Sequence, residues 1–260
     1  MTAEPTILRR MIIFGGRGRI GNSTIANAVF EEMQRRAHEV TAWDLDRAPM
    51  LARFVEARRP TGPDGKPDGS DPARRRALEK AIDETIRGTK HAVVDPGGGD
   101  DPMVLQLQDR LPDMTALFAD AGLETVAVHV VGPQLKDLAY YRAVQGTATY
   151  ARQVVVLNYG MAPDGVDPDA AFTLVRKTVG NSCPVFVVRQ LPPAAIDALL
   201  DRDKGYTMRE VAENDASGLI FTHRMELISW LNGDAERREG ISPLVDELMQ
   251  DPPPVLPAAA

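Results

Sequence analysis

The sequence predicts an α/β fold, a doubly wound and mostly parallel sheet flanked by helices, with a helical C-terminal region. The main observation is a series of short apolar runs, rich in β-branched residues, that recurs along the chain. Each run is followed by a segment with the apolar spacing of a helix. Strict alternation of this kind is typical of a parallel sheet whose two faces are both covered by helices.

The expected elements can be placed in chain order. The apolar runs predict strands at Leu8–Phe14, Glu39–Trp43, His91–Asp95, Thr125–Val131, Gln153–Asn158 and Val185–Val188. Helical spacing falls between them at Thr24–Arg36, Asp71–Arg87, Met103–Ala121, Leu135–Tyr150 and Asp169–Val179. Ligands of such folds bind at the carboxyl ends of the strands, so we expect the functional residues in the loops that follow them.

Residues 1–250 are expected to form a single domain, because the alternation runs through most of the chain. Residues 59–72, rich in Pro, Gly and Asp, interrupt the alternation and are interpreted as an exposed loop insertion. Residues 192–250 show only helical patterns, at Ala194–Leu200, Thr207–Glu213 and His223–Leu231. This part is expected to pad the sheet edge or to bind a protein partner. The proline-rich residues 251–260 predict a disordered tail.

Composition limits the classes of function. No stretch approaches the roughly 18 apolar residues of a membrane span, and the first residues lack the apolar run of a signal peptide, so a cytoplasmic protein that does not engage membranes is expected. The single cysteine, Cys183, excludes an internal disulfide and a cysteine-clustered metal site. The formal net charge of −7 argues against a chain-wide grip on nucleic acid. Local basic clusters such as Arg74–Arg76 leave nonspecific DNA binding open, although they equally suit solvated helix faces.

A glycine-rich loop links the first strand to the first helix. Its sequence is Gly15-Gly16-Arg17-Gly18-Arg19-Ile20-Gly21-Asn22-Ser23-Thr24. Free backbone N–H groups and the positive end of a helix dipole make such a loop suitable for binding a phosphate. The glycines at positions 16, 18 and 21 satisfy the dinucleotide pattern G-x-G-x-x-G, and Asp44 lies about where the ribose-binding acid is expected. The loop also nearly satisfies the P-loop pattern G-x-x-x-x-G-K-S/T, with Asn22 in place of the lysine. Spacing alone leaves both interpretations open.

The segment after the third long strand favours the P-loop interpretation. Asp95 ends that strand and is followed by Pro96-Gly97-Gly98-Gly99-Asp100. A carboxylate at a strand end can hold Mg²⁺ through a water molecule, while a flexible glycine turn beside it can respond to a γ-phosphate.

Taken together, these segments resemble the ParA/MinD group of deviant-Walker P-loop ATPases. Arg17–Thr24 is similar to their K-G-G-x-G-K-S/T-T motif, Asp44-Leu45-Asp46 to their D-x-D, and Asp95–Gly98 to their Walker B region. Val154–Asn158 resembles the strand whose terminal asparagine reads adenine. Within the group, the likeness is to the plasmid-encoded branch of TraL-like conjugal transfer and StbB-like plasmid stability proteins. It is carried by Asp95–Asp100, Ala121–Glu124, Val128–Pro133, Val156–Gly160 and Gly205–Val211.

The resemblance implies a site for ATP and Mg²⁺. The ATP-binding residues would be Arg17, Gly18, Arg19, Gly21, Asn22, Ser23, Thr24 and Asn158. Ser23 would ligate Mg²⁺, Asp95 would hold the ion through water, and Asp46 would orient the attacking water molecule. Simpler structural roles compete with these: Ser23 and Thr24 would suit a helix cap, Asp46 is a common type of strand-end residue, and Asn158 would stabilise its own turn.

Three departures from the motif put ATP hydrolysis in question. Neutral Asn22 cannot supply the lysine charge that bridges the β- and γ-phosphates. Arg17 keeps the charge of the signature lysine, whereas Arg19 replaces a glycine and either substitutes for the missing cation or obstructs the phosphates. We therefore expect a nucleotide-binding switch, at most a weak ATPase.

The expected switch acts as a homodimer in plasmid partition, stability, conjugal transfer or intracellular positioning. One alternative is an NAD(P)-binding oxidoreductase, although Tyr140 and Tyr141 have no lysine four residues on to complete a catalytic pair. The other alternative is a scaffold with a vestigial pocket that binds a protein partner.

Overall fold

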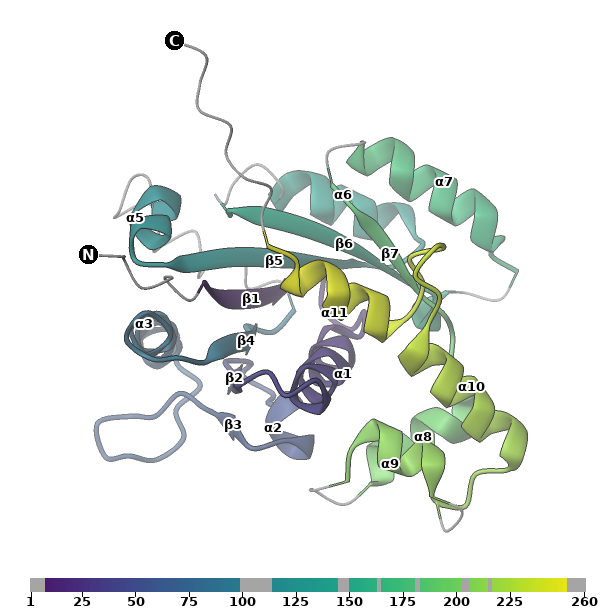
Figure 1. The fold of residues 1–260 in the computed structure, drawn as a ribbon, viewed down its shortest axis with the longest axis horizontal. Helices are drawn as coiled ribbons and strands as arrows, with labels where there is room; N and C mark the ends of the chain where they lie inside the picture. The colour runs from purple at the N-terminus through teal and green to yellow at the C-terminus, as the bar shows by residue number, and fades with distance from the viewer. Residues whose placement is uncertain are drawn as a thin grey trace, which may run out of the picture.

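The computed structural model describes residues 8–98, 114–144, 150–162, 165–180, 183–202, 206–214 and 217–251. Within these ranges, seven strands form one sheet in the order β3-β2-β4-β1-β5-β6-β7 (Figure 1). Every neighbouring pair of strands is parallel. The carboxyl ends of all these strands therefore lie along one edge of the sheet.

The elements have the following bounds. The strands are β1 (Arg9–Gly15), β2 (Val40–Asp44), β3 (Ala57–Arg58), β4 (His91–Asp95), β5 (Leu123–Val131), β6 (Arg152–Asn158) and β7 (Val185–Val188). The helices up to β7 are α1 (Asn22–Arg35), α2 (Leu51–Phe54), α3 (Asp71–Arg87), α5 (Met114–Asp120), α6 (Leu135–Val144), the 3₁₀ turn η1 (Tyr159–Met161) and α7 (Pro168–Val179). The C-terminal helices are α8 (Pro193–Asp201), α9 (Met208–Glu213), α10 (Phe221–Asn232) and α11 (Ile241–Met249).

The predicted alternation of strands and helices is confirmed, and the six predicted strands differ from the observed ones by at most two residues at an end. The sequence reading missed β3 and α2, which are too short to show a period. It also missed α11, although Ile241, Leu244, Val245 and Leu248 have clear helical spacing. Of the predicted helix Met103–Ala121, residues 103–113 lie outside the described residues. The helix predicted to reach Tyr150 ends at Val144 within the described part, and Tyr150 is not helical.

The core lies on both faces of the sheet, because successive strand residues point to opposite sides. Ile12 and Phe14 of β1 belong to a cluster with α1 and the C-terminal helices. Met11 and Ile13, the alternate residues of the same strand, pack with α3 instead. A third cluster joins β5, β6 and β7 to α6 and α7. Helices therefore flank the sheet on both sides.

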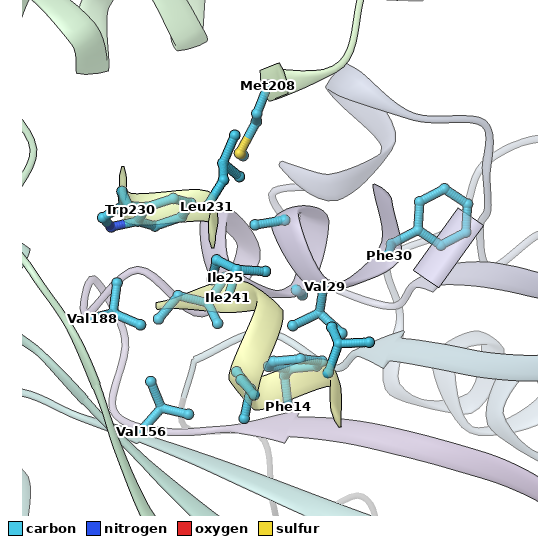
Figure 2. Close-up of a cluster of buried hydrophobic side chains, with 14 of the residues drawn as sticks. Phe14, Ile25, Val29, Phe30, Val156, Val188, Met208, Trp230, Leu231 and Ile241 are labelled. Carbon is cyan, nitrogen blue, oxygen red and sulfur yellow. The ribbon is translucent and has the colours of Figure 1, made fainter. Parts of the chain in front are cut away.

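Figure 2 shows the first of these clusters close up. Phe14 and Val156 of the sheet lie beside Val29 of α1 and Ile241 of α11. Helix α11 runs next to α1 over this face (Figure 1). The first strand and the last helix of the described chain therefore belong to the same hydrophobic core.

The remaining C-terminal helices, α8 to α10, lie together at the β7 side of α1 (Figure 1). The Trp230 indole N–H donates to the carbonyl oxygen of Arg189 at 3.1 Å, which fixes α10 to the segment after β7. No helix among the described residues is long and apolar enough to cross a membrane. The predicted tail begins at Asp251, whose carboxylate lies 2.9 Å from the Arg10 guanidinium. Residues 252–260 lie outside the described residues.

Candidate functional site

The loops after β1, β2 and β4 meet at the carboxyl edge of the sheet. Strand β4 lies between β1 and β2, and the last residue of β2, Asp44, is paired in register with Asp95 of β4. The structure therefore brings the predicted glycine loop, Asp46 and Asp95 to one place, although they are far apart in the sequence.

Close backbone approaches explain why the glycine loop needs its glycines. Gly21 caps α1 in the left-handed region, with φ of 87°, where a side chain is strained. A Cβ at Gly21 would also lie 2.5 Å from Nδ2 of Asn158, and one at Gly16 would lie 2.6 Å from the carbonyl oxygen of Val130. The loop therefore passes against the ends of β5 and β6 with no room for larger residues.

The glycine turn after β4 touches the same loop. A Cβ at Gly98 would lie 2.2 Å from the Cα of Gly18, so the two backbones are in direct contact. A Cβ at Gly97, whose φ is 88°, would lie 2.7 Å from Cγ of Asp46. The predicted Asp46 thus lies beside this turn. Gly99 and Asp100, the rest of the predicted Walker B segment, lie outside the described residues.

Asp95 is fully buried, and its carboxylate is only partly satisfied. Oδ1 accepts the backbone N–H of Gly97 at 3.1 Å, and the Ser23 hydroxyl lies close to the same carboxyl group. Oδ2 has no hydrogen-bond partner among the described residues. Burial raises the pKa of Asp95 to about 6, and the Asp44 carboxylate acts in the same direction. A buried carboxylate with a free oxygen beside a helix N-terminus is a candidate to receive a cation.

Asp44 has a different environment from Asp95, although both are fully buried. Its Oδ1 accepts the N–H of Asp46 at 3.1 Å, and its Oδ2 accepts the N–H of Ala52 at 2.7 Å. Burial raises the pKa of Asp44 as well. Both oxygens of Asp44 shape the turn after β2, so this residue holds Asp46 in place.

Asn22 occupies the lysine position of the P-loop pattern and is 6% exposed. Its Oδ1 has no hydrogen-bond partner among the described residues. The side chain turns back toward the start of the loop, since this oxygen would lie 2.8 Å from a Cβ at Gly16. Ser23 is half-buried and Thr24 is exposed, both in the first turn of α1.

The two arginines of the loop differ in their contacts. Arg17 Nε lies 2.7 Å from Oδ1 of Asp137, a buried residue in the first turn of α6. Arg19 is exposed and makes no hydrogen bond or ion pair with any part of the chain that the structure describes. Its φ of 66° places it in the left-handed region, which costs a residue with a Cβ roughly 1–2 kcal/mol.

Asn158 ends β6 and joins it to the glycine loop. Its Nδ2 donates to the carbonyl oxygen of Ile20 at 2.8 Å, and its Oδ1 accepts the N–H of Gly160 at 2.9 Å. The structural role that competes with adenine recognition is therefore present. Adenine recognition by Asn158 stays a prediction.

Sequence reasoning missed two residues of this region, Arg74 and Asp137. Arg74 is 1% exposed and donates to the carbonyl oxygens of Leu45 and Pro96, both at 2.7 Å. It thereby ties the loop that carries Asp46 to the turn after Asp95. One signal could have found it: Arg74 precedes Ala77 and Leu78 by three and four residues, so it lies on the apolar face of α3. No comparable signal marks Asp137.

No protein-family model matches the sequence, and no curated protein is similar to it at a significant level. The function therefore has to be argued from the site itself.

Proposed function

We propose that the chain is a nucleotide-binding switch on a P-loop scaffold of the ParA/MinD type, which binds ATP with Mg²⁺ and hydrolyses it weakly or not at all. The observation that carries this proposal is Oδ2 of Asp95, a buried carboxylate oxygen without a partner among the described residues. This carboxyl group lies close to the Ser23 hydroxyl, at the N-terminus of α1. An anion on the loop would bind the free N–H groups at the N-terminus of α1, and a cation beside Asp95 would satisfy its Oδ2.

The order of the strands supports this proposal over the dinucleotide alternative. In the dinucleotide-binding order, the second strand lies next to the first, so its terminal acid can reach a ribose bound at the glycine loop. Here β4 lies between them, and the oxygens of Asp44 are taken by backbone N–H groups. Asp44 is therefore poorly placed to bind a ribose.

The residues fit a Mg²⁺ ion that is shared with phosphates. Among the described residues, no group of three or more His, Cys, Asp or Glu side chains could hold a metal ion by itself. Ser23 would provide one ligand, Asp95 would hold the ion through water, and phosphate oxygens and water would complete the shell. When bound, Mg²⁺ would supply positive charge that neutralises the phosphates.

The same residues argue against fast hydrolysis. Asn22 is neutral and short, so it cannot provide the charge of the P-loop lysine on the β- and γ-phosphates. Asp46, in contrast, would favour hydrolysis, because it lies next to the Gly97 turn, where it would orient an attacking water molecule. The missing lysine charge is expected to outweigh this contribution. Nucleotide would then act mainly as a switching ligand, in a cytoplasmic homodimer for plasmid partition, stability, conjugal transfer or positioning. This cellular role rests on the resemblance of the motifs.

Calorimetric titration of the full chain tests the proposal. We expect ATP with Mg²⁺ to bind, NADH not to bind, and Asp95→Asn to lose most of the dependence on Mg²⁺. Asp83→Asn, which changes an exposed carboxylate on α3, is the matched control and should bind as the wild type does. Binding of NADH alone would overturn the proposal, and binding of neither ligand would favour the vestigial scaffold. If the wild type binds ATP, Asn22→Lys should raise its ATPase rate, because it restores the lysine of the P-loop pattern.

A further inference from the structure

The proposed phosphate site is poor in positive charge. Asp46 and Asp95 both lie at it, and Asn22 is neutral where the motif has a lysine. A nucleotide triphosphate would bring further negative charge next to these carboxylates. Since Mg²⁺ neutralises only part of that charge, the loop needs a cation of its own, and the loop contains two arginines.

Arg17 already has a carboxylate partner. Its Nε lies 2.7 Å from Oδ1 of Asp137, which is 3% exposed, whereas Arg17 itself is 38% exposed. The Asp137 side chain packs against the backbone of Gly132, since a Cβ at Gly132 would lie 2.4 Å from Oδ2 of Asp137. Withdrawing Arg17 would leave a buried carboxylate without this partner, which is unfavourable.

Arg19 has the opposite properties. It is exposed, makes no hydrogen bond or ion pair with the described residues, and lies in the strained left-handed region at φ of 66°. A glycine would adopt this conformation at no steric cost. Strained residues gather at sites of function, where the strain is tolerated because the side chain is needed there.

We infer that Arg19 is the residue that neutralises the phosphates of the bound nucleotide, in place of the missing lysine, and that the Arg17–Asp137 ion pair positions the loop. This inference rests on the function proposed above and deepens it. The guanidinium group matches phosphate oxygens in a bidentate geometry, so the ligand class is a nucleoside di- or triphosphate.

The substitution Arg19→Gly separates strain from binding, because it should move two measurements in opposite directions. The melting temperature should rise by about 2–4 °C as the left-handed strain is relieved. The dissociation constant for ATP with Mg²⁺ should increase at least tenfold, and its dependence on ionic strength should become weaker. Arg19→Lys keeps the charge but loses the bidentate geometry, so it should bind ATP more weakly than the wild type and more tightly than Arg19→Gly.

Arg238→Gly is the matched control, because Arg238 is an exposed arginine with φ of 54° on the far side of β7 from β1. It should leave nucleotide affinity unchanged, while the gain in stability from relieving the strain is partly offset by loss of the Arg238 contact over the Phe186 ring. If the wild type binds ATP and Arg19→Gly binds it equally well, the inference fails while the proposed function stands. Loss of binding in Arg17→Ala but not in Arg19→Gly would likewise overturn it. If the wild type binds no ATP, both the inference about Arg19 and the proposed function are wrong.

Discussion

The two edges of the sheet treat buried charge in opposite ways. At the amino edge, Arg10 Nε lies 2.8 Å from Oε2 of Glu124, and Arg152 Nη2 donates to the same oxygen at 3.3 Å, although Nε of Arg152 makes no hydrogen bond to the described residues. The two arginines also donate to carbonyl oxygens at the end of α11, Arg10 to Gln250 at 2.8 Å and Arg152 to Leu248 at 2.9 Å. This edge uses charge to fasten the C-terminal helix to the sheet.

At the carboxyl edge, charges and polar groups are buried without full compensation. Asp95 and Asn22 each keep an oxygen without a partner among the described residues, and the pKa of Asp95 is raised to about 6. The comparison indicates that the amino edge stabilises the fold, whereas the carboxyl edge holds unsatisfied groups that a ligand would satisfy. Removing the charge of Glu124 and removing the charge of Asp95 should therefore have opposite effects on stability.

Glu124→Gln at the amino edge should have the largest effect. Removing this charge leaves the buried Arg10 and the partly exposed Arg152 without their shared carboxylate, which should lower the free energy of unfolding by about 3–5 kcal/mol. Urea denaturation measures the change. Asp83→Asn, which breaks an exposed ion pair to Arg87, is the control and should change stability by less than about 0.5 kcal/mol. A loss below about 1 kcal/mol for Glu124→Gln would show that the network is not what fastens α11.

Asp95→Asn at the carboxyl edge should stabilise the protein in the absence of nucleotide. The folded-state pKa of about 6 lies above the ordinary value of 3.8, so the folded protein holds an extra proton between these values. Stability contributed by this group therefore falls as pH rises from about 4 to about 6. At 1.36 kcal/mol per pKa unit, the penalty at neutral pH is at most about 3 kcal/mol. The variant should regain up to that amount at pH 7.5.

Below about pH 4, Asp95→Asn should be no more stable than the wild type, because Asp95 is then protonated in both the folded and the unfolded protein. Denaturation curves at pH 7.5 and pH 3.5 measure the difference. Asp44→Asn is the contrasting control: an amide nitrogen would replace an oxygen that accepts a backbone N–H, so this variant should be less stable than the wild type. If Asp95→Asn were also destabilised at pH 7.5, the carboxyl edge would be a structural network like the amino edge.

Much of this architecture could be predicted from the sequence. Apolar runs located the strands, and their last residues, Asp95 and Asn158, were placed correctly at the carboxyl edge. The helix Asp71–Arg87 was predicted with both ends, since Pro72 and the terminal Gly88 mark them. These features depend on local spacing, which a sequence shows directly.

The contacts that define the site depend on residues far apart in the chain. The ion pair of Arg17 and Asp137 joins positions 120 residues apart, and the contact of Gly18 with Gly98 joins two loops. Periodicity carries no information on such pairs. Arg74 shows the same limit, because it was interpreted as part of a basic cluster and is instead buried beneath the site.

Arg74→Lys should have the smallest of the three effects. A lysine keeps the charge, but its single ammonium group cannot replace both guanidinium bonds to the carbonyl oxygens of Leu45 and Pro96. We expect a loss of about 1.5 kcal/mol in urea denaturation, together with weaker binding of ATP, because the loops that carry Asp46 and Asp95 lose their shared anchor. Arg76→Lys, an exposed change on the same helix, should leave both unchanged. If Arg74→Lys lost stability but bound ATP as tightly as the wild type, Arg74 would belong with the stabilising charges of the amino edge.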